Sequence, residues 1–453
     1  MRLRWAVPPP LIGACALAAL LLRSPEGDRA VLAVPLRYPP AGLLIDGSAG
    51  RVFVWSGDGH LLVLDSHSGA LLRSLDLGVA AAPPLLDEGA GRLYMASGGG
   101  GGRLVVVDAR SGRAVRTYQM PEPSALALDR RRHLLIVASG STAQLRILDS
   151  ASGRPRALLP LDAPPVAIGV DERRDRTVVL ERSAFGRDGF VALLATSTGR
   201  VLASYTVALN ADSLAIDSLH GYAWFEGSAV GGDAVSLLDM RTGTLGRGVR
   251  AGFGPYSLAM DEATGYAYVA SGSSNSLTLI PGANGGIRTV PGGPNPLAIT
   301  VLPGSGRVLA QDQPLGSGAM TVIDGRSGAT LRTVSFTGSL MALSGAPQPG
   351  YALALLRPDN VVDATSGPGA LEAIELATGG IVHSYVVGAN PFAMALDLRA
   401  GRVFVLSAGG VERAPERWSW LPWPLRERLL SISPGPPTGR AYPPSLSIVA
   451  LAR

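Results

Sequence analysis

A short turn that closes with glycine recurs along the chain and limits the folds open to it. Regular copies stand at residues 65–69 (DSHSG), 108–112, 149–153, 239–243 and 324–328, and less regular copies at 195–199, 281–285 and 375–379. The closing glycines are 41 to 51 residues apart, and each turn follows a short apolar run. The Asp side chain can accept backbone N–H bonds, and Gly supplies a positive φ. The pattern predicts a tight hairpin in each repeat.

A second turn that begins with Asp alternates with the first, at residues 46–50, 87–91, 217–221, 261–265 and 397–401. His133 and Asp175 replace the closing glycine in two further copies. Runs rich in Val, Tyr, Phe and Leu follow this turn. Pro255, Pro296 and Pro391 stand where the preceding strand would begin, a position that tolerates a missing donor. Each unit therefore predicts four short strands joined by two hairpins.

A four-stranded unit that recurs about every 40 residues is typical of a β-propeller blade. The sequence predicts an all-β fold: one closed propeller of eight to nine four-stranded blades over residues 31–453, preceded by an N-terminal hydrophobic segment with a short linker in residues 1–30. The units start near residues 40, 79, 121, 163, 211, 253, 294, 338 and 390. The ninth unit lacks a fourth strand, and we expect Ala30 to Leu36 to supply it and close the ring.

The predicted hairpins sort the connections into two faces. Both Asp/Gly turns lie on one face, and the loops between second and third strands lie on the other. The large insertions all fall in those loops, at residues 98–102, 181–189, 311–318, 357–369 and 409–444. Variable loops gathered on one face of a repeat ring usually mark the binding face.

The longest insertion holds half of the chain's six tryptophans: Trp418, Trp420 and Trp423, flanked by arginines such as Arg417. They could form a short helix packed over the ring, which is the most common fate of clustered aromatics. They could instead anchor a partner, because Trp and Arg are enriched at binding hot spots. A membrane-interface belt is a third alternative.

Polar residues on neighbouring insertions are Asp312, Arg357, Asp359, Asn360 and Asp363, and solvated loop charges explain them better than a ligand site does. The candidate partner-binding residues are therefore Trp418, Trp420, Trp423, Arg417, Arg357 and Asp359. The five histidines show no metal-ligand spacing, and no set of residues suggests catalysis or a cofactor. The sequence predicts a protein that is not an enzyme.

Arg2 and Arg4 precede an apolar run from Trp5 to Leu22, which is about 27 Å long as a helix. An uncleaved membrane anchor is favoured. A cleaved signal peptide, with Ala16 and Ala18 near its end, and a lipoprotein attached at Cys15 are the alternatives. All three place the body outside the cytoplasm, at a bacterial cell surface or in a periplasm.

The net charge of +5 is small for 453 residues and gives no support to nucleic-acid binding. All 40 basic residues are Arg, so Lys-based Schiff-base chemistry is excluded. Cys15 is the only cysteine, which excludes an intramolecular disulfide and a cysteine metal site.

The unit from Gly254 to Ile280 resembles the bacterial YVTN β-propeller repeats, with its strand at Pro255, its Asp261 turn, and the runs YVAS (268–271) and NSLT (275–278). Residues 387–397 (VGANPFAMALD) match the family's link between blades, although the YVTN tetrapeptide itself is absent. The resemblance implies exported or surface proteins of mostly undefined binding function, and it brings no catalytic residues.

The expected function is that of an exported or membrane-anchored propeller, without catalysis, that binds a protein or a glycan through its variable loops. The alternative is a propeller enzyme, lactonase-like or resembling quinone-cofactor dehydrogenases, whose channel site combines residues from different blades. The expected attachment to a membrane runs through residues 5–22.

Overall fold

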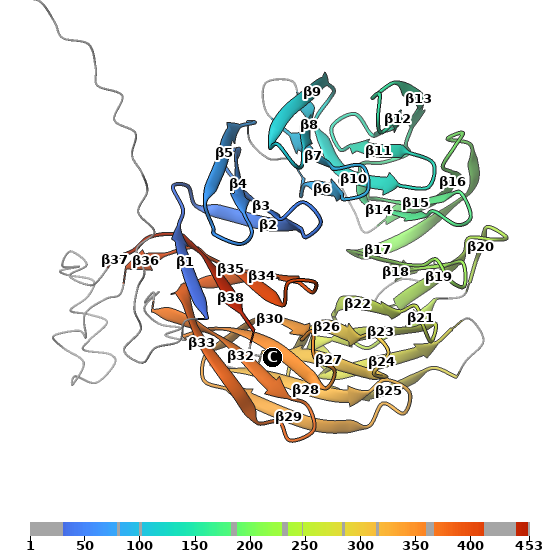
Figure 1. Ribbon diagram of the computed structural model, residues 1–453. Helices are drawn as coiled ribbons and strands as arrows, with labels where there is room; N and C mark the ends of the chain where they lie inside the picture. The colour runs from blue at the N-terminus through green and yellow to red at the C-terminus, as the bar shows by residue number, and fades with distance from the viewer. Residues whose placement is uncertain are drawn as a thin grey trace, which may run out of the picture.

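The computed structural model describes residues 30–78, 82–98, 102–182, 188–228, 234–246, 248–282, 286–313, 317–358, 367–411 and 441–451. They form nine four-stranded antiparallel blades arranged in a ring (Figure 1). The predicted all-β propeller is confirmed, and the blade number is nine. No helix in the described ranges is long and apolar enough to cross a bilayer, and the run from Trp5 to Leu22 lies outside those ranges.

The first five blades follow the chain in order. Blade 1 comprises β2 Pro40–Asp46, β3 Arg51–Ser56, β4 His60–Asp65 and β5 Leu71–Asp76. Blade 2 comprises β6 Leu85–Asp87, β7 Arg92–Ser97, β8 Arg103–Asp108 and β9 Arg113–Gln119. Blade 3 comprises β10 Pro123–Asp129, β11 Leu134–Ser139, β12 Gln144–Asp149 and β13 Pro155–Pro160. Blades 4 and 5 share the long strand β17 Val201–Asp217 and add β14 Pro165–Asp171, β15 Arg176–Arg182, β16 Asp188–Ala195, β18 Tyr222–Ser228, β19 Ala234–Asp239, β20 Thr244–Leu245 and β21 Val249–Arg250.

The last four blades complete the ring. Blade 6 comprises β22 Pro255–Asp261, β23 Tyr266–Ser271, the 3-10 turn η1 Gly272–Ser274, β24 Ser276–Pro281 and β25 Arg288–Pro291. Blade 7 comprises β26 Pro296–Leu302, β27 Arg307–Asp312, β28 Gly318–Asp324 and β29 Thr330–Phe336. Blade 8 comprises β30 Ser339–Gly345, β31 Tyr351–Arg357, β32 Pro368–Glu375 and β33 Ile381–Ala389. Blade 9 comprises β34 Pro391–Asp397, β35 Arg402–Ser407, β38 Ser445–Ala450 and β1 Val31–Pro35, beside the small pair β36 Gly410–Val411 and β37 Ala441–Tyr442.

The ends of the chain meet in blade 9. β1 pairs antiparallel with β38, from Val31 opposite Val449 to Pro35 opposite Ser445, and β38 pairs with β35 on its other side. The expected closure by residues 30–36 is therefore confirmed, and it decides between eight and nine blades, because β1 supplies the strand that the ninth unit lacks. Both edges of β38 are hydrogen-bonded, so the seam leaves no exposed edge on this strand.

The core lies between blades, not within a single sheet. First strands of neighbouring blades contact one another around the axis, whereas fourth strands such as β5 and β9 form the exposed rim. The middle strands are apolar on both faces because each face packs against the next blade. Phe53 and Val63 of blade 1, for example, share one buried cluster with Leu93 and Val105 of blade 2.

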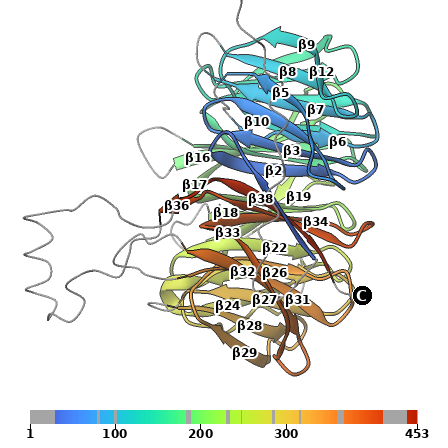
Figure 2. The same ribbon diagram turned by 60° about the vertical axis from the view of Figure 1, so that its left-hand side comes forward.

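The connections lie on two opposite faces, as Figure 2 shows from the side. We call turn face the side with the hairpins that join strands 1–2 and 3–4 of each blade. We call loop face the side with the strand 2–3 loops and the links between blades. Positive φ values at His133 (55°) and Asp175 (61°) confirm that these residues take the glycine position of the turn.

Candidate functional site

The hairpins of the turn face are stabilised by their aspartates. In blade 3, Asp149 Oδ1 accepts hydrogen bonds from the Ser152 backbone N–H (2.8 Å) and hydroxyl (2.7 Å), and Gly153 follows at φ 67°. These bonds and the Arg156 guanidinium hold the pKa of Asp149 well below its usual range. The recurring Asp therefore serves the turn itself, and the repeat needs no ligand to explain it.

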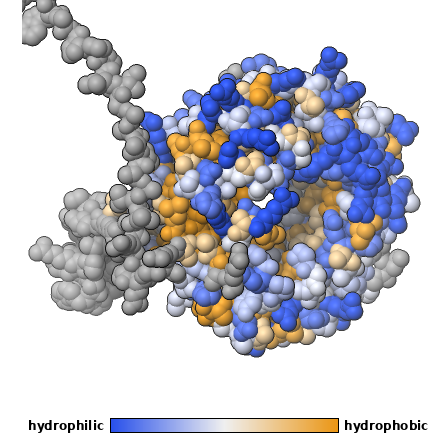
Figure 3. All heavy atoms as spheres, viewed as in Figure 1, coloured by the Kyte–Doolittle hydropathy of each residue, from blue (hydrophilic) through white to orange (hydrophobic). Residues whose placement is uncertain are grey.

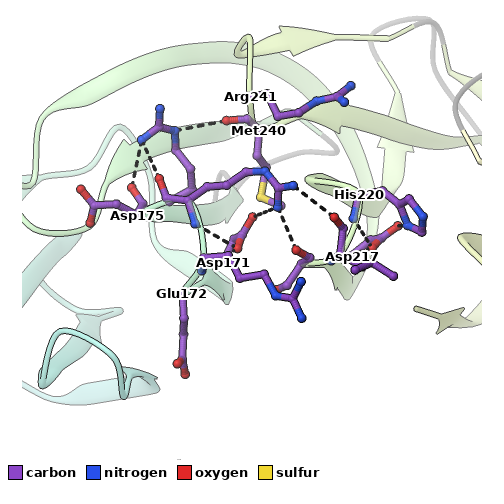
Figure 4. Close-up of polar contacts among 12 residues, drawn as sticks. Asp171, Glu172, Asp175, Asp217, His220, Met240 and Arg241 are labelled. Atoms are coloured by element: carbon purple, nitrogen blue, oxygen red, sulfur yellow. Dashed lines mark hydrogen bonds and ion pairs between the residues drawn. The ribbon is translucent and has the colours of Figure 1, made fainter. Parts of the chain in front are cut away.

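Arginines of the turn face join neighbouring blades, and Figure 4 shows such contacts between blades 4 and 5. Arg174 Nη1 donates to Asp171 Oδ2 (2.9 Å) and to the Ser218 carbonyl of the next blade (2.8 Å). Arg132 makes the same pair of contacts one blade earlier, to Asp129 Oδ2 (2.9 Å) and to the Glu172 carbonyl (2.7 Å). The carboxylates of Asp129 and Asp171 are therefore bound by structural arginines and are not available to act on a substrate.

The loop face exposes two aromatic side chains at blade 6. Phe253 is 70% exposed and Tyr256 is 54% exposed, in the link before β22 and near the start of that strand. The Phe253 backbone N–H donates to Ser274 Oγ (3.2 Å), and Gly252 and Gly254 on either side have positive φ values of 91° and 63°. The link is thus held in a defined conformation while its aromatic side chain faces solvent.

Two asparagines with positive φ (51° each) adjoin these aromatics. The Asn295 backbone N–H donates to Asn275 Oδ1 (2.7 Å), and Asn295 Nδ2 donates to the Gln313 carbonyl (3.3 Å). A Cβ on Gly272 would meet both the Tyr256 ring (2.7 Å) and Asn295 Oδ1 (2.6 Å), so the three residues are in close contact. We call Phe253, Tyr256, Asn275 and Asn295 the blade-6 platform.

A polar residue is buried at the end of the second strand in most blades, facing the incoming link. It is Ser in several blades (Ser56, Ser97, Ser139, Ser271 and Ser407), but Glu181 in blade 4 and Asp312 in blade 7. Glu181 Oε2 accepts hydrogen bonds from the backbone N–H groups of Asp162 (2.7 Å) and Ala163 (3.0 Å), and burial raises its pKa. The position thus fastens the link between blades.

The expectation of a solvated loop charge at Asp312 is wrong. Asp312 ends β27 and has no exposed surface, because blade 6 and the link residue Gly293 cover it. Its Oδ2 accepts a hydrogen bond from Thr321 Oγ1 (2.6 Å), and within the described chain Oδ1 has no hydrogen-bond partner. Desolvation raises the pKa of Asp312 to about 7.

Of the predicted binding residues, Arg357 lies within the described ranges. It ends β31 opposite Ser339, half-buried, one residue beyond Leu356, which has the position that Asp312 occupies in blade 7. Trp418, Trp420, Trp423, Arg417 and Asp359 lie outside the described residues and stay predictions. The described ranges contain no cluster of three His, Cys, Asp or Glu residues that could hold a metal ion.

The blade-6 platform was not predicted from the sequence. Its signal is an aromatic in a link: Gly252-Phe253-Gly254 precedes Pro255, and Tyr256 follows it. The positions that correspond to Tyr256 hold Ala41 in blade 1 and Ser124 in blade 3. This difference between repeats becomes informative only once the link is known to lie on the loop face.

The fold and its two unlike faces define a nine-bladed β-propeller with uniform turns on one side and variable loops on the other. A family model described as "Outer membrane protein assembly factor BamB" matches residues 39–243, which cover blades 1 to 4 and the first three strands of blade 5. No curated protein matches the chain.

Solved structures of other proteins resemble most of the chain at low sequence identity. A eukaryotic initiation factor is 11% identical over 78% of this chain and 89% of its own, with a TM-score of 0.58. The dihydro-heme d1 dehydrogenase NirN in complex with DHE is 14% identical over 78% of this chain and 68% of its own (TM-score 0.52). The computationally designed Ika8 protein is 13% identical over 82% and 94% (TM-score 0.50). Such unlike proteins share the fold alone, so function must be argued from the site.

Proposed function

We propose that this chain is an extracytoplasmic propeller without catalytic activity that binds a partner protein on its loop face. The observation that carries the proposal is the blade-6 platform. Two aromatic side chains are held exposed on a fixed link beside side-chain amides. Rigid aromatics next to adaptable polar groups are the usual anchors of protein interfaces, because they bury a large area at a small entropy cost.

The asymmetry of the two faces supports this proposal. Turn-face carboxylates are used in bonds within and between blades, whereas the predicted insertions, including the segment with Trp418, Trp420 and Trp423, all leave from the loop face. The BamB description of the matching model names an assembly factor, which agrees with a protein partner at an outer membrane. The resemblance to exported YVTN repeats and the apolar run of residues 5–22 agree with a body outside the cytoplasm.

A propeller enzyme is the second candidate, and Asp312 is the observation that favours it. A buried acid with a pKa raised to about 7 is suited to proton transfer, and perturbed acids concentrate at active sites. Against this reading, its neighbour Thr321 and the covering Gly293 leave Asp312 without exposed surface. The enzyme hypothesis can be tested by measuring the melting temperature with divalent ions and with quinone cofactors. A cofactor that raises the melting temperature of the parent, and raises it less in Asp312→Asn, would favour the enzyme.

Site-specific crosslinking tests the binding face. A photoreactive phenylalanine analogue replaces Tyr256 on the loop face or Leu219 on the turn face, which are 54% and 42% exposed. In intact cells we expect a discrete crosslinked species from position 256 and none from position 219. Discrete products from position 219 alone would place the partner on the wrong face and refute the proposal.

A paired substitution measures the contribution of the platform. The double variant Phe253→Ala with Tyr256→Ala should lower the affinity for the crosslinked partner at least about tenfold, which is the usual effect of removing a binding hot spot. Its melting temperature should be unchanged. The matched control, Leu158→Ala with Val201→Ala, removes side chains of similar exposure (56% and 53%) from the outer rim and should leave affinity unchanged.

A further inference from the structure

Exposed arginines gather on the turn face of blades 2 to 4. Figure 3, which views this face, shows hydrophilic residues along the upper and right-hand rim of the ring. We call this set the arginine arc; its members, all exposed, are Arg110, Arg113, Arg116, Arg130, Arg131, Arg154, Arg156, Arg173 and Arg200. Arginines that hold the blades together, such as Arg132 and Arg174, are only partly exposed (30% and 26%) and do not belong to it.

Much of the arc is not used by the fold. Within the described residues, the side chains of Arg113, Arg131, Arg154, Arg173 and Arg200 make no hydrogen bond or ion pair, whereas Arg130 pairs with Glu172 and Arg156 with Asp149. A structural role explains the second group. The five guanidinium groups of the first set, which are spread over neighbouring turns, have no structural role that explains them.

The acids among these turns do not cancel the charge at the surface. The carboxylates of Asp129 and Asp171 are 0% exposed and each is paired with a partly buried arginine. Asp108 and Asp149 are 29% and 20% exposed, and Glu88 is the one acid of the exposed class in the described turns of blades 2 to 4. The arc therefore presents positive charge outward, in the form of groups whose planar geometry suits phosphate.

The chain enters the propeller at this same face. β1 enters blade 9 at the turn face: the Ala450 N–H donates to the Ala30 carbonyl (2.8 Å), and the next residue, Leu451, donates to the carbonyl of Gly401 in a turn (3.1 Å). Seven residues, 23–29, separate Ala30 from the apolar run that ends at Leu22. Even fully extended, they span at most about 25 Å.

We infer that the turn face lies on the surface of an anionic bilayer, with the arginine arc contacting lipid phosphates and residues 5–22 attaching blade 9 to the same bilayer. An apolar anchor and a basic patch on one face reinforce each other, because the anchor raises the local concentration of headgroups around the arginines. This orientation leaves the loop face directed away from the lipid. It stands apart from the proposed function, since a propeller with no partner could still lie this way.

Fluorescence quenching in vesicles tests the inference on the full-length chain. Cys15→Ser removes the native thiol, and a cysteine for a fluorophore is introduced by Ala151→Cys on the turn face or Ser141→Cys on the loop face. Both are exposed positions in blade 3 at its two opposite ends. The protein is reconstituted into phosphatidylcholine vesicles with or without phosphatidylglycerol, each doped with a lipid that carries a quencher at its headgroup.

In anionic vesicles we expect strong quenching at position 151 and little at position 141. Quenching at 151 should fall severalfold in phosphatidylcholine alone, and also in high salt, because screening shortens the reach of the charges. Equal quenching at 151 in neutral and anionic vesicles would mean that the tether alone sets the orientation, which overturns the role of the arc. Quenching at 141 would overturn the orientation itself.

Charge reversal in the arc provides the second arm. Arg131→Glu with Arg154→Glu should abolish the preference for phosphatidylglycerol, whereas Arg37→Glu with Arg250→Glu, two exposed arginines on the loop face, should preserve it. The melting temperature of each variant confirms the fold. If the Glu pair unfolds, Arg131→Gln with Arg154→Gln should still weaken the preference severalfold. Identical behaviour of the arc and loop-face pairs would refute the inference.

Discussion

The carboxylate of Asp312 lies directly against Gly293, so that a Cβ on residue 293 would come within 1.8 Å of Asp312 Oδ2. Gly293 belongs to the link between blades 6 and 7, and Asp312 ends the second strand of blade 7. The link can pass over the acid only because it has no side chain there. Gly293 and Asp312 are therefore packed directly against each other, although they are far apart in the sequence.

Gly293→Ala should therefore destabilise the fold. The added methyl group meets a fully buried carboxylate that cannot swing into solvent, and overpacking of this kind costs about 1–3 kcal/mol. Asp312→Ser, which installs the residue that several blades have at this position, should recover most of the loss in the double variant. Chemical denaturation of the four proteins gives the coupling energy. Gly57→Ala, where nothing lies within 4 Å, is the control and should be nearly neutral.

The raised pKa of Asp312 predicts a pH dependence of stability. Its pKa is about 7 in the fold and about 3.9 in an unfolded chain, so between these values the native state holds a proton that the unfolded state has released. The unfolding free energy should therefore fall as pH rises from about 4 to about 7. Asp312→Asn should remove this decline, matching the parent near pH 4 and exceeding its stability above pH 7.

Asp149→Asn serves as a control in which the pH dependence of stability should have the opposite sign. Its pKa is lowered by the bonds from Ser152 and Arg156, so the charged form stabilises the fold. The substitution should destabilise the protein at neutral pH, and this difference should disappear as the solution is acidified below the carboxylate's ordinary range. Parallel pH profiles for the two asparagine variants would contradict both assignments.

Two buried tyrosines join neighbouring blades by equivalent hydrogen bonds. Tyr94 Oη donates to the Ser150 carbonyl (3.1 Å), and Tyr268 Oη donates to the Gly325 carbonyl (3.0 Å), each one residue past the turn aspartate of the next blade. Tyr94→Phe and Tyr268→Phe should each cost about 1–3 kcal/mol, because the carbonyl is left buried without its donor. Tyr256→Phe, at an exposed site, should cost almost nothing. Equal melting of all three variants would show that these bonds add no stability.

Closure of the ring depends on β38, which pairs with β1 and β35. Deleting residues 444–453 should expose two strand edges at once and cause aggregation or a large loss of stability, which sedimentation and thermal melting would detect. Deleting residues 452–453 alone leaves every ladder bond of the described residues in place and should be tolerated. A soluble longer deletion with an unchanged melting profile would mean that the ring closes elsewhere.

The repeat made the architecture predictable, because each strand pair is set by a local turn. His133 and Asp175 were identified as substitutes for glycine from their place in the period, and their positive φ values confirm it. Closure by residues 30–36 followed from the missing strand of the last unit, and the β1–β38 pairing confirms it. Local chemistry was sufficient at these positions.

The site was less predictable, because it depends on contacts between blades. The sequence places Asp312 in the insertion of residues 311–318, whereas β27 includes that residue and the fold buries it completely. Phe253 and Tyr256 carry an ordinary aromatic signal, and only the position of their link on the loop face makes their exposure meaningful. The sequence pattern of one strand does not show which of its residues the neighbouring blade will bury.

The tryptophans of the long insertion stay a prediction, and one variant can decide their role. Replacing Trp418, Trp420 and Trp423 with Ala should leave the melting temperature nearly unchanged and abolish capture of the partner crosslinked at position 256, if they form a binding anchor. If they pack over the ring, stability should fall by about 3–5 kcal/mol for each one buried. Trp224→Ala, at a side chain only 2% exposed, calibrates the cost of a buried tryptophan. Lost stability with intact capture by the folded fraction would exclude the binding role, because an anchor must affect capture before it affects folding.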